Sequence, residues 1–95
     1  MTQDVNQVLQ RAKDGGEVYL CTLTRDELKK TGFDMSTFGY FEYVDIYLLY
    51  DIDYVIKYVF DGDITDTYYE NTNDVGGEEI FVDIIKSYLR IGGNE

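Results

Sequence analysis

Residues 43–60 (YVDIYLLYDIDYVIKYVF) constrain the fold more than any other segment, because apolar residues occupy alternate positions along much of it. Val44, Ile46 and Leu48 are each separated by one residue, which is the period-2 pattern of a strand with one buried face. β-branched and aromatic residues dominate the segment, and both classes favour strands. The pattern therefore predicts paired strands in this region.

A second spacing in the same region indicates a helix instead. The tyrosines from Tyr40 to Tyr54 are three and four residues apart, so a helix would place them in one stripe. Because the composition favours strands, we expect strands over residues 41–50 and 54–60 with a turn at 51–53, and we keep the helix as the alternative.

Three other segments carry helix signals. Asp4 with Gln7, and Thr24 with Glu27, have the spacing of capping boxes, which satisfy free N–H groups in the first turn of a helix. Near the C-terminus a broad set of apolar residues recurs at helical spacing. The predicted helices span residues 4–13, 25–31 and 78–91.

Two further strands complete the predicted fold. Residues 17–23 carry apolar side chains on both faces, so we expect a central strand. The dipeptide Asp61-Gly62 is typical of a two-residue type I′ hairpin, which predicts another strand over residues 64–70. The order α-β-α-β-β-β-α predicts a single α+β domain over residues 1–95, with a small, mostly antiparallel sheet packed by helices.

The chain is strongly acidic, since nineteen acids face eight bases and no histidine, for a formal charge of −11. Residues 32–84 hold thirteen of the acids and one base, Lys57, which is a net charge of −12. The same segment holds thirteen of the fifteen aromatic residues, whereas solvating acidic tails are poor in aromatics. Direct binding to nucleic acid or to an anionic membrane is excluded as the main role, because both require a basic surface.

The sequence also indicates where the protein acts. The single cysteine, Cys21, cannot form an internal disulfide, which fits a reducing compartment. No basic segment followed by an apolar core marks a signal peptide, and no apolar run approaches the roughly 20 residues of a membrane span. We expect a soluble cytoplasmic protein.

Catalytic and ligand-binding motifs are absent from the sequence. Cys21 lies in an apolar strand of a chain without histidine, so we interpret it as a buried core residue. The stretch from Asp61 to Asp66 resembles the start of a calcium loop, but the glycine and glutamate that such a loop requires are missing. No nucleotide or zinc motif occurs either. We therefore predict a non-enzyme without cofactor or metal; an enzyme would need a deep pocket lined by carboxylates with raised pKa values.

The concentrated acid has two interpretations. It can keep a small protein soluble, or reflect a salt-rich habitat. It can also form a docking surface, because acids at every second residue of a strand recur about 6–7 Å apart and neighbouring strands lie about 4.8 Å apart. These spacings are comparable with the phosphates of a nucleic-acid strand, so such a surface would suit the basic groove of a nucleic-acid-binding protein.

In its small size, acidity and aromatic content, and in its lack of catalytic residues, the chain resembles the phage-encoded inhibitors of bacterial defence, the anti-CRISPR proteins and antirestriction DNA mimics. The resemblance is one of kind and includes no family motif. It depends on the acidic run from Glu42 to Asp83, with the stretches YVDIYLLYDIDY, FDGDITD and TNDVGGEEIF. It implies a binding protein that blocks the nucleic-acid site of a nuclease complex. If a phage encodes the chain, its location is the host bacterial cytoplasm.

Our hypothesis is an acidic inhibitor, monomeric or homodimeric, that acts as a DNA mimic on a Cas effector or restriction nuclease. Its carboxylates would pair with the Arg and Lys side chains of the partner, and tyrosines would serve as anchors. The candidate contacts are Glu42, Asp45, Asp51, Asp53, Asp61, Asp63, Asp66, Glu70, Asp74, Tyr47, Tyr68 and Tyr69.

The alternative is an interaction module that does not mimic nucleic acid, such as an antitoxin, an immunity protein or a small assembly subunit. Such a module would bind its partner through an apolar surface, for which the tyrosines from Tyr40 to Tyr54 are the candidates. Loss of binding on tyrosine substitution, together with tolerance of charge reversal, would favour this alternative.

Overall fold

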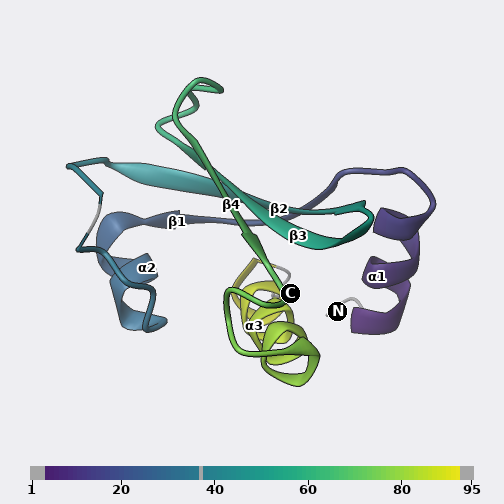
Figure 1. Ribbon diagram of the computed structural model, residues 1–95. Coiled ribbons are helices and arrows are strands. Elements are labelled where there is room, and N and C mark those ends of the chain that lie inside the picture. Colours follow the sequence, from purple (N-terminus) through teal and green to yellow (C-terminus); the bar gives the residue numbers. More distant parts are fainter. Residues whose placement is uncertain (1–3, 37, 93–95) are drawn as a thin grey trace.

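The computed structural model describes residues 4–36 and 38–92 and has the predicted element order. Three helices and four strands form an α+β fold around one sheet (Figure 1), which confirms the predicted fold class. The elements are α1 (Val5–Lys13), β1 (Val18–Thr24), α2 (Arg25–Lys30), β2 (Tyr43–Asp51), β3 (Asp53–Phe60), β4 (Thr67–Asn71) and α3 (Glu78–Gly92).

Local sequence signals determine where the helices begin. The Asp4 carboxylate accepts a hydrogen bond from the Asn6 N–H at the start of α1, in place of the predicted pairing with Gln7. At α2 the capping box is complete: Thr24 Oγ1 accepts from the Glu27 N–H, and Glu27 Oε1 accepts from the Thr24 N–H. These bonds satisfy backbone donors that the first helical turn leaves free.

The sheet is an antiparallel meander in the order β1-β2-β3-β4. The prediction that residues 17–23 form a central strand is therefore wrong, because β1 lies at an edge. The apolar pattern of β1 has a different explanation. A register shift between Tyr19 and Cys21 places both Leu20 and Cys21 in the interior. A bulge thus buries two successive side chains, which otherwise point to opposite faces.

The two faces of the sheet differ in what covers them. All three helices lie on one side of the sheet, and Figure 1 shows no helix on the other side. The core lies between the sheet and the helices, where Ile46, Ile56 and Phe81 are fully buried. We call the uncovered side the open face.

The connection between β3 and β4 is longer than the predicted two-residue hairpin. Asp61 and Gly62 both have positive φ, as expected for a type I′ turn, but β4 begins at Thr67 rather than at residue 64. Asp63 causes the difference, because its carboxylate accepts hydrogen bonds from the N–H and Oγ1 of Thr65 and extends the turn. We call residues 61–66 the β3–β4 loop.

Candidate functional site

A row of large side chains crosses all four strands on the open face. The strand register pairs Tyr19 with Tyr47, Tyr47 with Lys57, and Lys57 with Tyr69. The side chains of Tyr19 and Tyr69 are 52% and 55% exposed. Neither ring is buried under a helix, although a small domain could have used both in its core. The row therefore displays two exposed tyrosine rings on the edge strands, with the partly buried Tyr47 and Lys57 between them.

The cation in this row is neutralised within the chain. Lys57 Nζ lies 2.7 Å from Glu17 Oε2, and this hydrogen bond is the main cause that raises the lysine pKa. The same Nζ lies 5.5 Å from the centroid of the Tyr47 ring, within the range of a cation–π contact. Lys57, the single base of residues 32–84, thus supplies no free positive charge for nucleic acid.

Further contacts fix the tyrosine row and its surroundings. The rings of Tyr19 and Tyr47 meet edge to face, with centroids 5.7 Å apart. The hydroxyls of Tyr19 and Thr22 lie 2.5 Å apart, and Thr22 donates to Asp45 Oδ1 at 2.6 Å. Beside the row, Leu49 pairs with Val55 and leaves a half-buried aliphatic strip. The centre of the open face is therefore aromatic and aliphatic, with Asp45 as the candidate carboxylate nearest to it.

Acids gather at one end of the open face, at the β2–β3 turn. Asp51 and Asp53 are exposed and stand on either side of Ile52, which is 92% exposed and has a φ of 70°. Asp53 is held in place by Thr72, whose Oγ1 donates to Asp53 Oδ2 at 2.9 Å. A β-branched residue with positive φ is unfavourable, so backbone geometry does not explain why isoleucine occupies this position.

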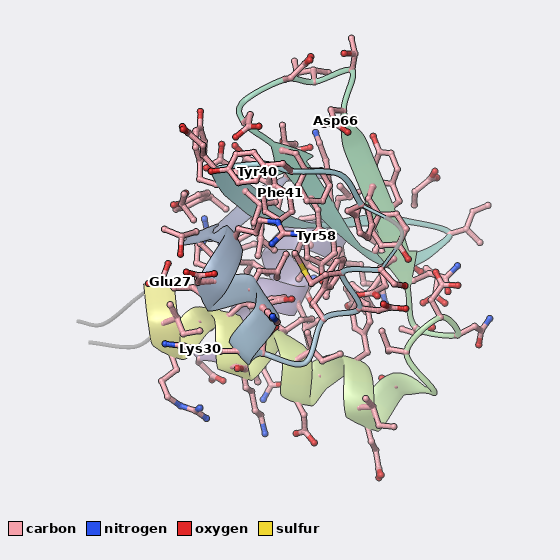
Figure 2. All side chains as sticks on the ribbon, turned by 90° about the vertical axis from the view of Figure 1, so that its left-hand side faces the viewer. Glu27, Lys30, Tyr40, Phe41, Tyr58 and Asp66 are labelled. Atoms are coloured by element: carbon pink, nitrogen blue, oxygen red, sulfur yellow. The ribbon has the colours of Figure 1, made fainter. Side chains whose placement is uncertain are left out.

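A second group of acids lies on the β3–β4 loop, which projects from the sheet on the side away from the helices (Figure 1). Figure 2 shows Asp66 on this projection, far from α3. Asp61 Oδ1 accepts from the N–H groups of Glu42 and Tyr43, and the turn hydrogen bonds to Thr65 lower the pKa of Asp63. These hydrogen bonds connect the loop to the start of β2 and shape its turn, and residues 61–66 are exposed.

Three of the nine candidate acids have exposed carboxylates with no hydrogen bond inside the described part of the chain: Glu42, Asp51 and Asp66. The others each accept at least one internal hydrogen bond, which fixes their orientation. The three free carboxylates are therefore those that substitution can alter with the least effect on the fold.

Three of the predicted contacts lie away from the open face. Tyr68 packs against Phe38, with ring centroids 5.2 Å apart, on the helix-covered side. Glu70 is on the same side and accepts a hydrogen bond of 3.0 Å from the Tyr58 hydroxyl. Asp74 lies in the loop before α3, where its Oδ2 accepts from the Asn71 N–H. The structure does not bring these residues together with the tyrosine row.

The tyrosines from Tyr40 to Tyr54 do not form one stripe, so the helical alternative is wrong. Tyr40 precedes β2, and Tyr47 lies on the open face. Tyr50 lies on the helix-covered side, where its ring meets that of Tyr54 at 4.9 Å. Tyr47 and Tyr50 are three positions apart in β2, so strand alternation places them on opposite faces.

A cavity of about 270 Å³ opens between β4, α3 and the segment after α2. Its lining includes Phe33, Asp34, Glu70 and Tyr88. Burial raises the pKa of Glu70, whereas hydrogen bonds from Ser36 lower that of Asp34. The cavity thus has two carboxylates in its lining, which differ in the direction of their pKa shifts.

The remaining chemical candidates are structural. Cys21 is buried as predicted, and burial raises the pKa of its thiol to about 12, so it is protonated at neutral pH. Within residues 4–36 and 38–92, no group of three or more Cys, Asp or Glu side chains could hold a metal ion. No helix in the same ranges is both long and apolar enough to cross a bilayer.

The sequence did not identify several residues of the open face: Glu17, Tyr19, Leu49, Ile52, Val55, Lys57 and Ile64. Tyr19 is in the neutral N-terminal third of the chain, 28 positions before Tyr47, its partner in the sheet. Period-2 alternation could have placed each residue on a face of its own strand. Only the strand register shows that the separate strands form one row.

Comparisons with protein-family models, curated proteins and solved structures found no match to this chain. The fold and its surface therefore define the class: a small α+β protein with a four-stranded antiparallel meander, helices on one face and acids around the other.

Proposed function

We propose that this chain is an acidic protein inhibitor that binds the basic nucleic-acid-binding surface of another protein. The class of target that we favour is a bacterial defence nuclease, either a Cas effector or a restriction enzyme, acting in the bacterial cytoplasm. The inhibitor would block that surface sterically and electrostatically, as a DNA mimic does.

The observation that carries this proposal is the distribution of charge over the fold. The elements α1, β1 and α2 come from a neutral part of the sequence, whereas β2, β3, β4 and their turns hold most of the excess acid. Exposed like charges repel one another, and this repulsion costs stability in the free protein. A basic partner would relieve the repulsion and gain charge-assisted hydrogen bonds.

A second candidate function is supported by the centre of the open face. Tyr19, Tyr47 and Tyr69 stand there in place of the row of carboxylates that a phosphate mimic would present throughout. An antitoxin, an immunity protein or an assembly subunit would use such an aromatic centre more than its acidic border. The two functions differ in their sensitivity to charge reversal.

Phage plating tests the inhibitor function directly. The chain is expressed in bacterial strains that each carry one restriction or CRISPR–Cas system, and plaques of a targeted phage are counted. We expect wild-type protein to raise the plating efficiency at least about tenfold in one or more strains. Reversal of Glu42, Asp51 and Asp66 to lysine should abolish this protection.

The matched control reverses three exposed acids of α3 on the helix-covered side, Glu78, Glu79 and Asp83, which changes the net charge equally. Retained protection by this control would locate the effect at the border of the open face. Protection by neither wild type nor control in any strain would overturn the inhibitor function. Full protection by the Glu42, Asp51 and Asp66 variant would contradict the electrostatic mechanism and favour the second candidate.

A further inference from the structure

From the open face we infer the kind of partner surface that this protein binds: an apolar patch between two groups of Arg or Lys side chains. The inference deepens the proposed function and rests on it in one respect, the basic character of the partner. The apolar centre of the contact is argued independently from the tyrosine row and two exposed isoleucines.

Charge is distributed unevenly around the open face. Its centre is close to neutral, because Lys57 is paired with Glu17 at 2.7 Å. Acids lie at its two ends, on the β2–β3 turn and on the β3–β4 loop. A desolvated aromatic centre with a charged rim is the usual anatomy of a protein–protein interface. The complementary surface has an apolar centre and basic groups at both ends.

Two exposed isoleucines lie beside the acids at the two ends of the open face. Ile52 is 92% exposed between Asp51 and Asp53, and Ile64 is 78% exposed next to Asp63. Single exposed apolar residues are common, but these two occupy the tips of the two hairpins that border the open face. Glycine or asparagine would fit the positive φ of Ile52 better, so contact with a partner explains isoleucine where folding does not.

The area of the open face limits what the face can bind by itself. Nine residues of β2 span about 30 Å, and four strands span about 19 Å, which gives roughly 570 Å² in projection. A standard interface buries about 800 Å² on each partner. The open face alone is therefore too small, and a stable contact has to include the acidic hairpin tips at its ends.

Two other occupants fit the charges poorly. Aromatic rows on sheets can stack nucleobases, but such sites also need a basic groove, and Lys57 is already paired. A second copy of the chain would bring together two molecules that each carry a charge of −11. Both occupants remain measurable outcomes of the test.

The test uses two peptides of equal charge, Arg-Arg-Gly-Leu-Phe-Leu-Gly-Arg-Arg and the same peptide with Ser in place of Leu and Phe. Each is titrated into the labelled full chain and followed by amide chemical shifts. We expect the apolar-centred peptide to bind at least about fivefold more tightly. Its shifts should map to Tyr47, Lys57, Tyr69 and the two hairpin tips.

Replacing both Tyr19 and Tyr69 by serine should remove the difference between the peptides, and Ile52→Asn should reduce it. The control, Tyr50→Ser, changes a half-exposed tyrosine of β2 on the opposite side of the sheet and should leave the difference intact. Equal binding of the two peptides, or shifts confined to the acidic loops, would overturn the inference.

Further results separate this inference from its competitors. Tight binding of a single-stranded oligonucleotide at the tyrosine row would overturn the inference in favour of nucleic acid. Dimerisation that is lost when Tyr19 and Tyr69 are replaced would overturn it in favour of a second copy of the chain. Phage protection that tolerates both tyrosine substitutions would also overturn it while leaving the proposed function intact. The expected peptide preference without phage protection would leave the inference standing and reject the inhibitor function.

Discussion

Tyr58 and Tyr69 lie on neighbouring strands of one sheet, and their surroundings differ because they point to opposite faces. Tyr58 is fully buried between the sheet and the helices (Figure 2), and its hydroxyl lies 2.9 Å from that of Tyr88. Tyr69 is 55% exposed, and its hydroxyl forms no hydrogen bond within the described part of the chain. One residue type therefore stabilises the fold on one face and remains available on the other.

The stability of the fold and the proposed binding therefore depend on different faces of the sheet. The helix-covered face holds the core cluster and a hydrogen-bond network of Tyr58, Tyr88 and Glu70. The open face holds the tyrosine row, whose exposed rings contribute less to the core. Substitutions on the two faces should therefore differ sharply in their effect on the free energy of unfolding.

The largest difference is expected between neighbouring residues of β3. Ile56 is fully buried, and Ile56→Ala should lower the free energy of unfolding by about 2–5 kcal/mol, because it leaves a cavity in the core. Val55 is half-buried on the open face, and Val55→Ala should cost less than about 1 kcal/mol. Urea unfolding of the two variants measures both values. Equal costs would show that the open face is part of the core.

Local sequence signals predicted much of the difference between the two faces of the sheet. The features that these signals did not predict depend on pairing between distant strands. The capping box of Thr24 and Glu27 involves residues three apart, so the sequence shows α2 directly. Alternation in β2 likewise separated Ile46 from Tyr47. The position of β1 depends instead on a bulge and on pairing with β2, and neither is visible in a single segment.

The candidate site shows the same limit. Alternation can assign Tyr47 and Lys57 to faces of their own strands, but it cannot say which face the helices cover. Asp51 and Asp66 were identified as members of the acidic run, which a count of charges along the chain shows directly. Tyr19 and Ile52 were missed because their importance depends on the register and on one backbone angle.

A smaller difference is expected from removing one hydroxyl on each face. Tyr58→Phe leaves the Glu70 carboxylate without its donor and the Tyr88 hydroxyl without its partner, so it should cost about 1–3 kcal/mol of stability. Tyr69→Phe should change stability by less than about 0.5 kcal/mol. Thermal and urea unfolding measure both effects. A neutral Tyr58→Phe would mean that the buried network contributes nothing to the fold.

The smallest effect is expected at Glu70, and it depends on pH. Burial raises the pKa of this carboxyl in the folded state, so the folded protein holds the proton at pH values where the unfolded chain has released it. Its contribution to stability is therefore fully present below the ordinary pKa of glutamate. That contribution is lost as the pH rises through the raised value.

Glu70→Gln should consequently be more stable than wild type at pH 7, and the difference should shrink as the pH falls toward 4.5. The glutamine oxygen can still accept from Tyr58, so the buried network keeps its geometry. Glu42→Gln, at an exposed carboxylate without an internal hydrogen bond, controls for the loss of one acid from a chain of charge −11. Equal gains in stability for both variants at every pH would contradict this prediction. Relief of the overall charge repulsion would then explain the gain, and the burial of Glu70 on the helix-covered face would have no separate effect.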